Sequence, residues 1–96
     1  MITTVVVSRE ARKQHAKLPS QVRAAFDRWA TLIGEYGLHE VRKIRGYHDE
    51  PITRGPHAGE RSVRLGRAWR LFYVLASTGV AEVVEVVEIN KHLYDR

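Results

Sequence analysis

Residues 61–89, RSVRLGRAWRLFYVLASTGVAEVVEVVEI, determine the fold class of this chain. The run 61–65 alternates polar residues with Val63 and Leu65, and the run 70–76 is rich in apolar residues. A short connection joins them, and Thr78 and Gly79 then turn the chain into a third run. Short β-branched and aromatic runs bounded by such turn residues are typical of strands. We therefore predict three consecutive strands in this part of the chain.

The third run, 80–89, carries two conflicting periodicities. Its glutamates, Glu82, Glu85 and Glu88, recur every third residue, which favours a helix. Its other residues are almost all valine or isoleucine, whose branched side chains favour a strand, and a hairpin turn precedes them. We interpret the run as a strand and, because apolar residues lie on both of its faces, as a central strand of the sheet.

Upstream of these strands the sequence predicts two helices and a first strand. Residues 21–36 place apolar side chains at steps of three and four, and Gly37 ends this pattern. Ser8 can cap a shorter helix over 9–18. Residues 2–7 are almost all β-branched and predict a strand. The apolar positions of the longer helix are Val22, Ala25, Phe26, Trp29, Ala30, Ile33 and Tyr36.

The segment 38–59 is rich in glycine and proline, and here we expect a short extended piece at 41–44 followed by a long loop. The predicted element order is β-α-α-β-β-β. This order indicates a single α+β domain over residues 1–96, with two N-terminal helices packed on a mainly antiparallel four-stranded sheet.

Composition excludes several classes of protein. Of the 96 residues, 44% are hydrophobic and 28% are charged, as in a globular domain. Cysteine is absent, which excludes disulfides, thiolate metal sites and a cysteine nucleophile. The longest apolar run, 71–76, is too short to span a membrane, and residues 1–7 lack the basic region of a signal peptide. We therefore expect a cytoplasmic protein.

The charge of the chain favours a polyanionic partner. Its formal net charge is +5, and arginine outnumbers lysine by twelve to four. Guanidinium groups keep their charge when partly desolvated and bind phosphate through two hydrogen bonds. The segment 54–70 alone contains five arginines and one acid. Nucleic acid or an acidic protein surface is the expected partner.

Alternation along the strands separates these arginines. Arg64 and Arg61 fall on opposite faces. Arg70 alternates with large apolar residues, so we expect its side chain to point along the core-facing side or into a concavity. The alternative is a structural arginine that pairs with a glutamate of the last strand, such as Glu82 or Glu88.

Among the five histidines, His92 stands out because it follows the last strand beside Lys91 and Tyr94. For the loop histidines, His48 and His57, the sequence favours a bystander role over a functional one, which stays open. No histidine pair has metal-ligand spacing, and neither a glycine-rich phosphate cradle nor a serine triad is present. We therefore predict no metal and no cofactor.

Arginines, a histidine near the C-terminus, a tyrosine and loop carboxylates are the groups that metal-free RNA cleavage requires. A base removes the proton of the ribose 2′-OH, cations stabilise the charged phosphorane, and an acid protonates the leaving 5′ oxygen. Imidazole suits the acid or base role because it titrates near working pH.

The element order, the stretch RSVRLGRAWRLFYVL at 61–75 and the ending EINKHLYDR resemble the RelE/ParE toxin superfamily of bacterial toxin–antitoxin systems. Ribosome-dependent mRNA interferases of the RelE, YoeB and HigB kinds carry a pattern R-x5-R-h-x-Y, which Arg64, Arg70 and Tyr73 match. The resemblance covers essentially the whole chain.

YoeB-like members also carry a Glu-Pro pair in the preceding loop and a histidine near the C-terminus, matched here by Glu50, its following proline and His92. The resemblance implies a general base at Glu50, phosphate stabilisation by Arg70 and an acid at His92. This chain departs from the YoeB ending, since one residue separates His92 from Tyr94. RelE itself relies more on lysine and arginine, so Lys91 and Arg61 remain candidates.

The resemblance implies a type II toxin that cuts mRNA in the ribosomal A site and is silenced by a cognate antitoxin. Its catalytic candidates are Glu50, Arg64, Arg70, His92 and Tyr94, and its candidates for RNA or ribosome binding are Arg54, Arg61, Arg67 and Lys91. The general base stays open between Glu50, Lys91 and Tyr94.

The main alternative is a ParE-like toxin that inhibits DNA gyrase by binding alone. His92 and Tyr94 favour the nuclease, because a pure binder needs no titrating group there. A plain RNA-binding module is a third interpretation, but the exposed aromatic pattern of single-strand binders is missing.

Overall fold

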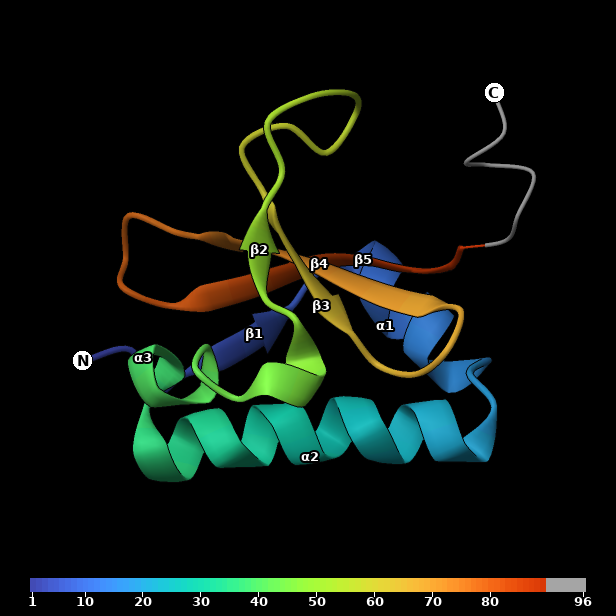
Figure 1. Cartoon of the computed structure of the whole chain (residues 1–96), viewed down its shortest axis with the longest axis horizontal. Coiled ribbons are helices and arrows are strands. Elements are labelled where there is room, and N and C mark those ends of the chain that lie inside the picture. The colour runs from blue at the N-terminus through green and yellow to red at the C-terminus, as the bar shows by residue number, and fades with distance from the viewer. Residues whose placement is uncertain (90–96) are drawn as a thin grey trace.

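The computed structural model describes residues 1–89 (Figure 1). Its elements, in chain order, are β1 (Val5–Val7), α1 (Arg9–Ala16), α2 (Ser20–Tyr36), α3 (Leu38–Val41), the 3-10 helix η1 (Arg45–Tyr47), β2 (Glu50–Pro51), β3 (Arg61–Arg64), β4 (Trp69–Leu75) and β5 (Ala81–Glu88). The α+β class predicted from the sequence is confirmed.

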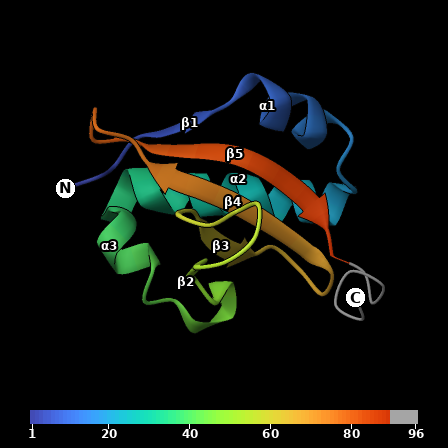
Figure 2. The same ribbon diagram turned by 90° about the horizontal axis from the view of Figure 1, so that it is seen from above.

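The strands form one sheet in the order β1-β5-β4-β3-β2. Strand β1 runs parallel to β5, and every other neighbouring pair is antiparallel. Strand β5 has hydrogen-bonded neighbours on both sides, as its two apolar faces predict. Helix α2 lies along one face of the sheet, whereas the loop between β2 and β3 rises from the other (Figures 1 and 2).

The segment 38–59 differs from the prediction in two respects. Residues 41–44 are not extended, because Val41 ends α3 and the chain then turns. Leu38 and Val41 are both buried, and their spacing places them on one side of a helical turn. The sheet has five strands instead of four, because Glu50 and Pro51 pair with β3. A strand of two residues is too short to show an alternating pattern in the sequence, so only its pairing with β3 reveals it.

The helix signals in the sequence are confirmed. The Ser8 hydroxyl accepts a hydrogen bond from the Ala11 backbone N–H, which caps α1. Helix α1 ends at Ala16, before the predicted end at Leu18. Helix α2 ends at Gly37, whose φ of 85° is a left-handed conformation that glycine adopts without strain. No helix within residues 1–89 is long and apolar enough to cross a membrane.

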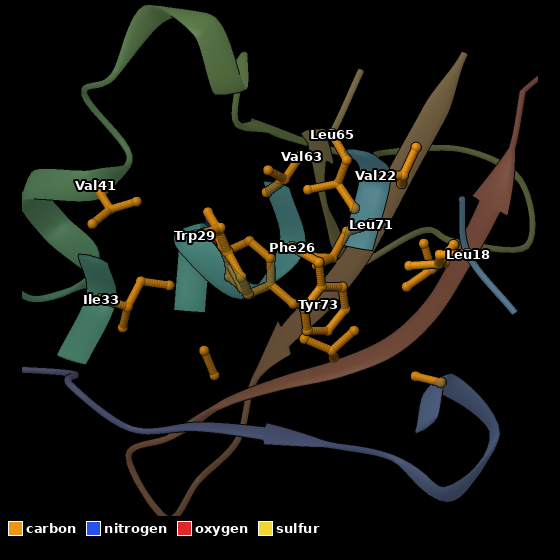
Figure 3. Packing of buried hydrophobic residues seen from close by; sticks show 14 of the residues in the cluster. Leu18, Val22, Phe26, Trp29, Ile33, Val41, Val63, Leu65, Leu71 and Tyr73 are labelled. Atoms are coloured by element: carbon orange, nitrogen blue, oxygen red, sulfur yellow. The ribbon is translucent and has the colours of Figure 1, made fainter. Parts of the chain in front are cut away.

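The core lies between α2 and the sheet (Figure 3). Trp29 of α2 and Tyr73 of β4 are its largest fully buried side chains, and their ring centroids are 5.4 Å apart. Phe26 and Ile33 extend the same stripe of α2 on either side of Trp29. Fully burying one such large apolar side chain stabilises the fold by about 2 to 3 kcal/mol.

A buried carboxylate links this core to the chain segment before β2. The two oxygens of Asp49 accept hydrogen bonds from Arg61 Nε and from the Tyr73 hydroxyl, each at 2.6 Å. The Asp49 side chain is only 1% exposed. Burial, reinforced by Asp49, raises the pKa of the Tyr73 phenol well above its ordinary value, so this hydroxyl stays a donor.

Removing this carboxylate should destabilise the fold. Asp49→Ala leaves the Tyr73 hydroxyl and the partly buried Arg61 without their acceptor, and we expect the free energy of unfolding to fall by about 2 to 3 kcal/mol. Urea denaturation followed by far-UV circular dichroism measures the change. Glu40→Ala is the matched control, since it breaks an exposed pair with Lys43 and should leave stability nearly unchanged. Equal effects of the two variants would contradict a structural role for Asp49.

Candidate active site

Strand alternation divides the side chains of β3 and β4 between the two faces of the sheet. Val63 and Leu71 pair with each other and are fully buried on the side of α2. The adjacent pair, Arg64 and Arg70, therefore lies on the opposite, open face. Arg70 lines a concavity on this face. Of the two orientations expected from the sequence, along the core-facing side or into a concavity, the structure has the second.

The loop formed by residues 52–60 stands over the open face above β3 and β4 (Figure 2). Beneath it is a cavity of about 300 Å³, here called the loop cavity. Residues from β2, the loop, β3, β4 and the end of β5 line it: Glu50, Ile52, Arg54, Pro56, His57, Ser62, Arg70, Phe72 and Ile89. The fold thus brings the predicted Glu50, Arg54 and Arg70 to one cavity.

Three predicted site residues, Lys91, His92 and Tyr94, lie outside the described residues. Ile89, the last residue that the structure describes, lines the loop cavity. Within residues 1–89, no group of three or more histidine, aspartate or glutamate side chains is arranged to hold a metal ion.

Two arginines are neighbours across β3 and β4, although only Arg70 lines the loop cavity. Arg64 and Arg70 are directly opposed in the β3–β4 register. Within residues 1–89, neither is paired with a carboxylate, so the alternative of an Arg70 pair with Glu82 or Glu88 is not observed. Like charges directly opposed across two strands destabilise a sheet. Such a pair is suited to bind an anion, whose charge removes the repulsion.

Glu50 contributes a carboxylate at the edge of the same cavity. Its side chain is half exposed, and its carboxylate lies 3.4 Å from Nε2 of His48. A partly exposed carboxylate can accept a proton from a bound hydroxyl group. His48, which we expected to be a bystander, therefore lies beside a candidate catalytic group.

His57 is the residue of the loop cavity that sequence reasoning missed. Its ring stacks on Phe72 with the centroids 3.7 Å apart and the planes 3° from parallel. Its two ring nitrogens face the carboxylates of Glu60 and Glu85. In the sequence, only Glu60, three residues after His57, hints at a partner for this histidine. Phe72 and Glu85 are distant in sequence and reach His57 only in the folded chain.

The predicted RNA-binding arginines occupy different surroundings. Arg54 is exposed on the loop and Arg67 is exposed in the connection between β3 and β4. Arg61 lies on the side of the core, where its guanidinium donates to Asp49. Burial lowers the pKa of Arg61, but the hydrogen bond and charge of Asp49 more than offset this effect. The structure therefore separates Arg61 from the open face.

A second cavity, of about 420 Å³, lies between α2, η1 and the β3–β4 connection. It is lined mainly by apolar side chains, including Leu32, Ile44 and Leu65, with Arg28 and Arg64 among them. No carboxylate or imidazole lines it. Of these two cavities, only the loop cavity is lined by a carboxylate and an imidazole, those of Glu50 and His57.

The repulsion between the two opposed arginines can be measured. Arg64→Gln should raise the free energy of unfolding by up to about 0.5 kcal/mol at low ionic strength, because it removes one of two facing positive charges. Added salt should shrink this gain, because it screens the repulsion in the wild type. Urea denaturation at two salt concentrations checks the effect, with Arg45→Gln, an exposed arginine of η1, as control. A less stable Arg64→Gln protein at low salt would argue against the repulsion.

Solved structures of toxin–antitoxin proteins resemble this chain. They include a chain of the archaeal RelE–RelB complex from Pyrococcus horikoshii, with 16% identity, a TM-score of 0.71 and coverage of 95% of this chain and 99% of that one. YafQ from E. coli has 18% identity and a TM-score of 0.66, over 94% of this chain and 96% of that chain. A chain of the RelBE2 toxin–antitoxin complex from Mycobacterium tuberculosis has 23% identity and a TM-score of 0.64, over 92% and 99%.

No protein-family model matches the sequence, and no curated protein matches it. The structural matches span nearly the whole of both chains, and at these identities they establish the fold. The resemblance read from residues 61–75 and from the C-terminal ending is thereby confirmed at the level of architecture: this chain has the fold of the RelE and YafQ toxins.

Proposed function

We propose that this protein is the toxin of a type II toxin–antitoxin system and that it is an endoribonuclease cleaving mRNA in the ribosomal A site. The observation that carries the proposal is the loop cavity, which gathers Glu50 from β2 and Arg70 from β4 on an open face. Arg64 stands directly opposite Arg70. Cleavage of a phosphodiester bond by the 2′-OH needs a base that takes a proton and a cation that stabilises the phosphorane, and a carboxylate and a guanidinium can supply them.

The proposed reaction needs no metal. The Glu50 carboxylate takes the proton of the ribose 2′-OH, and the 2′ oxygen attacks the adjacent phosphorus. Arg70, with Arg64 opposite, stabilises the negative charge of the phosphorane. The bond to the 5′ oxygen breaks, and His92 gives this oxygen its proton. The products are a 2′,3′-cyclic phosphate and a free 5′-OH.

The remaining predicted residues would serve proton transfer or binding. Tyr94 and Lys91 stay candidates for the base, and Lys91 also for binding the phosphate backbone. The exposed Arg54 and Arg67 would attract the ribosome and mRNA by charge. Arg61 would act through the fold, since its guanidinium is held by Asp49. We place the reaction in the cytoplasm, where the ribosomes are.

An antitoxin is the proposed protein partner. The archaeal RelE and the M. tuberculosis RelBE2 neighbour were both solved as toxin–antitoxin complexes. The net charge of +5 on this chain suits an acidic partner surface.

Primer extension on mRNA in a translating extract tests the proposal. Addition of the protein should produce discrete cleavage products on translated mRNA and none on the same mRNA without ribosomes. DNA gyrase supercoiling is assayed in parallel. Inhibited gyrase together with uncut mRNA would replace the nuclease with the ParE-like alternative.

The acid–base assignments are tested by isosteric replacement. Glu50→Gln and His92→Gln should each keep the fold and lower the cleavage rate by about 10² to 10⁴-fold, the usual contribution of a general base or acid. The measurement is single-turnover cleavage of ribosome-bound mRNA, with unfolding curves as the control for folding. An undiminished rate for Glu50→Gln would pass the base role to Lys91, Tyr94 or a ribosomal group. Wild-type cleavage by His92→Gln would remove His92 from the mechanism.

Arg70 should act on the transition state more than on binding. Its side chain is partly buried in the loop cavity, so the charge is held in place as the phosphorane forms. Loss of one such donor costs about 3 kcal/mol, or about 10²-fold in rate. Arg70→Ala should therefore lower the single-turnover rate at saturating ribosomes while leaving ribosome affinity nearly unchanged.

Arg67→Ala is the matched comparison, because Arg67 is exposed and lies outside the loop cavity. This variant should weaken ribosome binding, most strongly at low salt, and keep the saturated rate. If Arg70→Ala instead loses affinity with its saturated rate intact, Arg70 is a docking residue.

A further inference from the structure

His57 makes two contacts from the loop to the sheet and one within the loop. Its ring lies flat on Phe72 of β4 at a centroid distance of 3.7 Å. Nδ1 is 2.6 Å from a carboxylate oxygen of Glu60, at the base of the loop, and Nε2 is 2.8 Å from a carboxylate oxygen of Glu85 on β5. Both nitrogens of one imidazole thus face acceptors.

With Glu60 and Glu85 both ionised, the imidazolium is the form of His57 that can donate to each of them. A carboxylate can only accept, and a neutral imidazole carries a single N–H. The imidazolium donates from both nitrogens, whereas the neutral ring would direct a lone pair at one of the carboxylates. The side chains of Glu60 and Glu85 are 19% and 35% exposed, so solvent screens these pairs less than it screens pairs on the open surface.

The other hydrogen bonds of the loop hold it to itself. Ile52 N–H donates to Glu60 O at 2.8 Å and Gly59 N–H donates to Ile52 O at 2.9 Å, which closes the base of the loop. Within residues 1–89, the hydrogen bonds and ion pairs that join residues 53–59 to β4 or β5 run through His57 alone. Without this side chain, none of these polar contacts would hold residues 53–59 to β4 or β5.

We propose that His57 is a positioning residue that, as the imidazolium, clamps the loop onto β4 and β5 and so fixes the loop cavity. The clamp holds the loop that carries Arg54, which lines the cavity together with Glu50 and Arg70. The charged groups around the ring are Glu60 from the base of the loop, Glu85 from β5, Arg70 from β4, Glu50 from β2 and Arg54 from the loop itself. The effect of the clamp on cleavage rests on the proposed function, whereas its effect on the position of the loop does not.

The test combines amide hydrogen exchange of residues 53–60 with single-turnover cleavage, both across pH, on the full chain. The exchange rates are first corrected for their intrinsic dependence on pH. In the wild type, the corrected rate should then rise in a single step with pH, as the imidazolium loses its proton. His57→Gln should remove the step and show exchange about tenfold faster throughout, the loss expected for a charge-assisted hydrogen bond. Its saturated cleavage rate should fall about tenfold while the KM for ribosomes stays nearly constant.

Glu85→Gln supplies the signature that a merely structural role lacks. The amide keeps an oxygen acceptor for the His57 ring but removes one negative charge that stabilises the imidazolium, so the step should move to lower pH. His39→Gln, the same change at an exposed histidine of α3, should leave exchange and cleavage unchanged.

The inference is overturned if His57→Gln exchanges at the wild-type rate, or if the step in Glu85→Gln stays at the wild-type pH. Should His57→Gln fail to fold, Glu85→Gln alone decides. A wild type that leaves ribosome-bound mRNA intact defeats the proposed function, but the exchange measurements still decide the clamp.

Discussion

The Asp49 carboxylate is the constraint on which the candidate site depends. It is shut off from solvent and receives hydrogen bonds from Arg61 of β3 and Tyr73 of β4. A buried carboxylate without such partners would cost several kcal/mol, so the chain at residue 49 is held against these two strands. The next residue begins β2, and because side chains alternate in extended backbone, Glu50 leaves on the opposite face and reaches the loop cavity. One buried contact thus positions the candidate base.

The sheet separates stability from chemistry. On the side of α2, packing of Trp29 against Tyr73 and burial of Val63 and Leu71 stabilise the fold. The open face holds the opposed pair Arg64 and Arg70, whose like charges lower the free energy of unfolding. The packing on the side of α2 offsets this cost. A strained or repulsive arrangement persists when the surrounding structure determines it, and such arrangements concentrate at functional sites.

The fold of this chain and its proposed activity are supported by different observations. The structural neighbours share the fold at 16% to 23% identity, so most residues of the chain can differ while the fold is kept. A shared fold does not by itself carry a shared activity. The proposed cleavage therefore depends on the loop cavity of this chain, where Glu50 and Arg70 meet.

The sequence by itself determined the α+β class, the capped helix at Ser8, the long helix ending at Gly37 and the strands of residues 61–89. Each rests on a local rule of periodicity, capping or turn chemistry that acts within a few residues. It also placed Arg64 and Arg70 in one motif and assigned them to strands. Tertiary structure alone decided that β2 pairs with β3, that Asp49 binds Arg61 and Tyr73, and that His57 lies between Glu60 and Glu85. These contacts join residues from separate elements, and no periodicity along the chain records which strands become neighbours or which side chains the loop meets when it folds over the sheet.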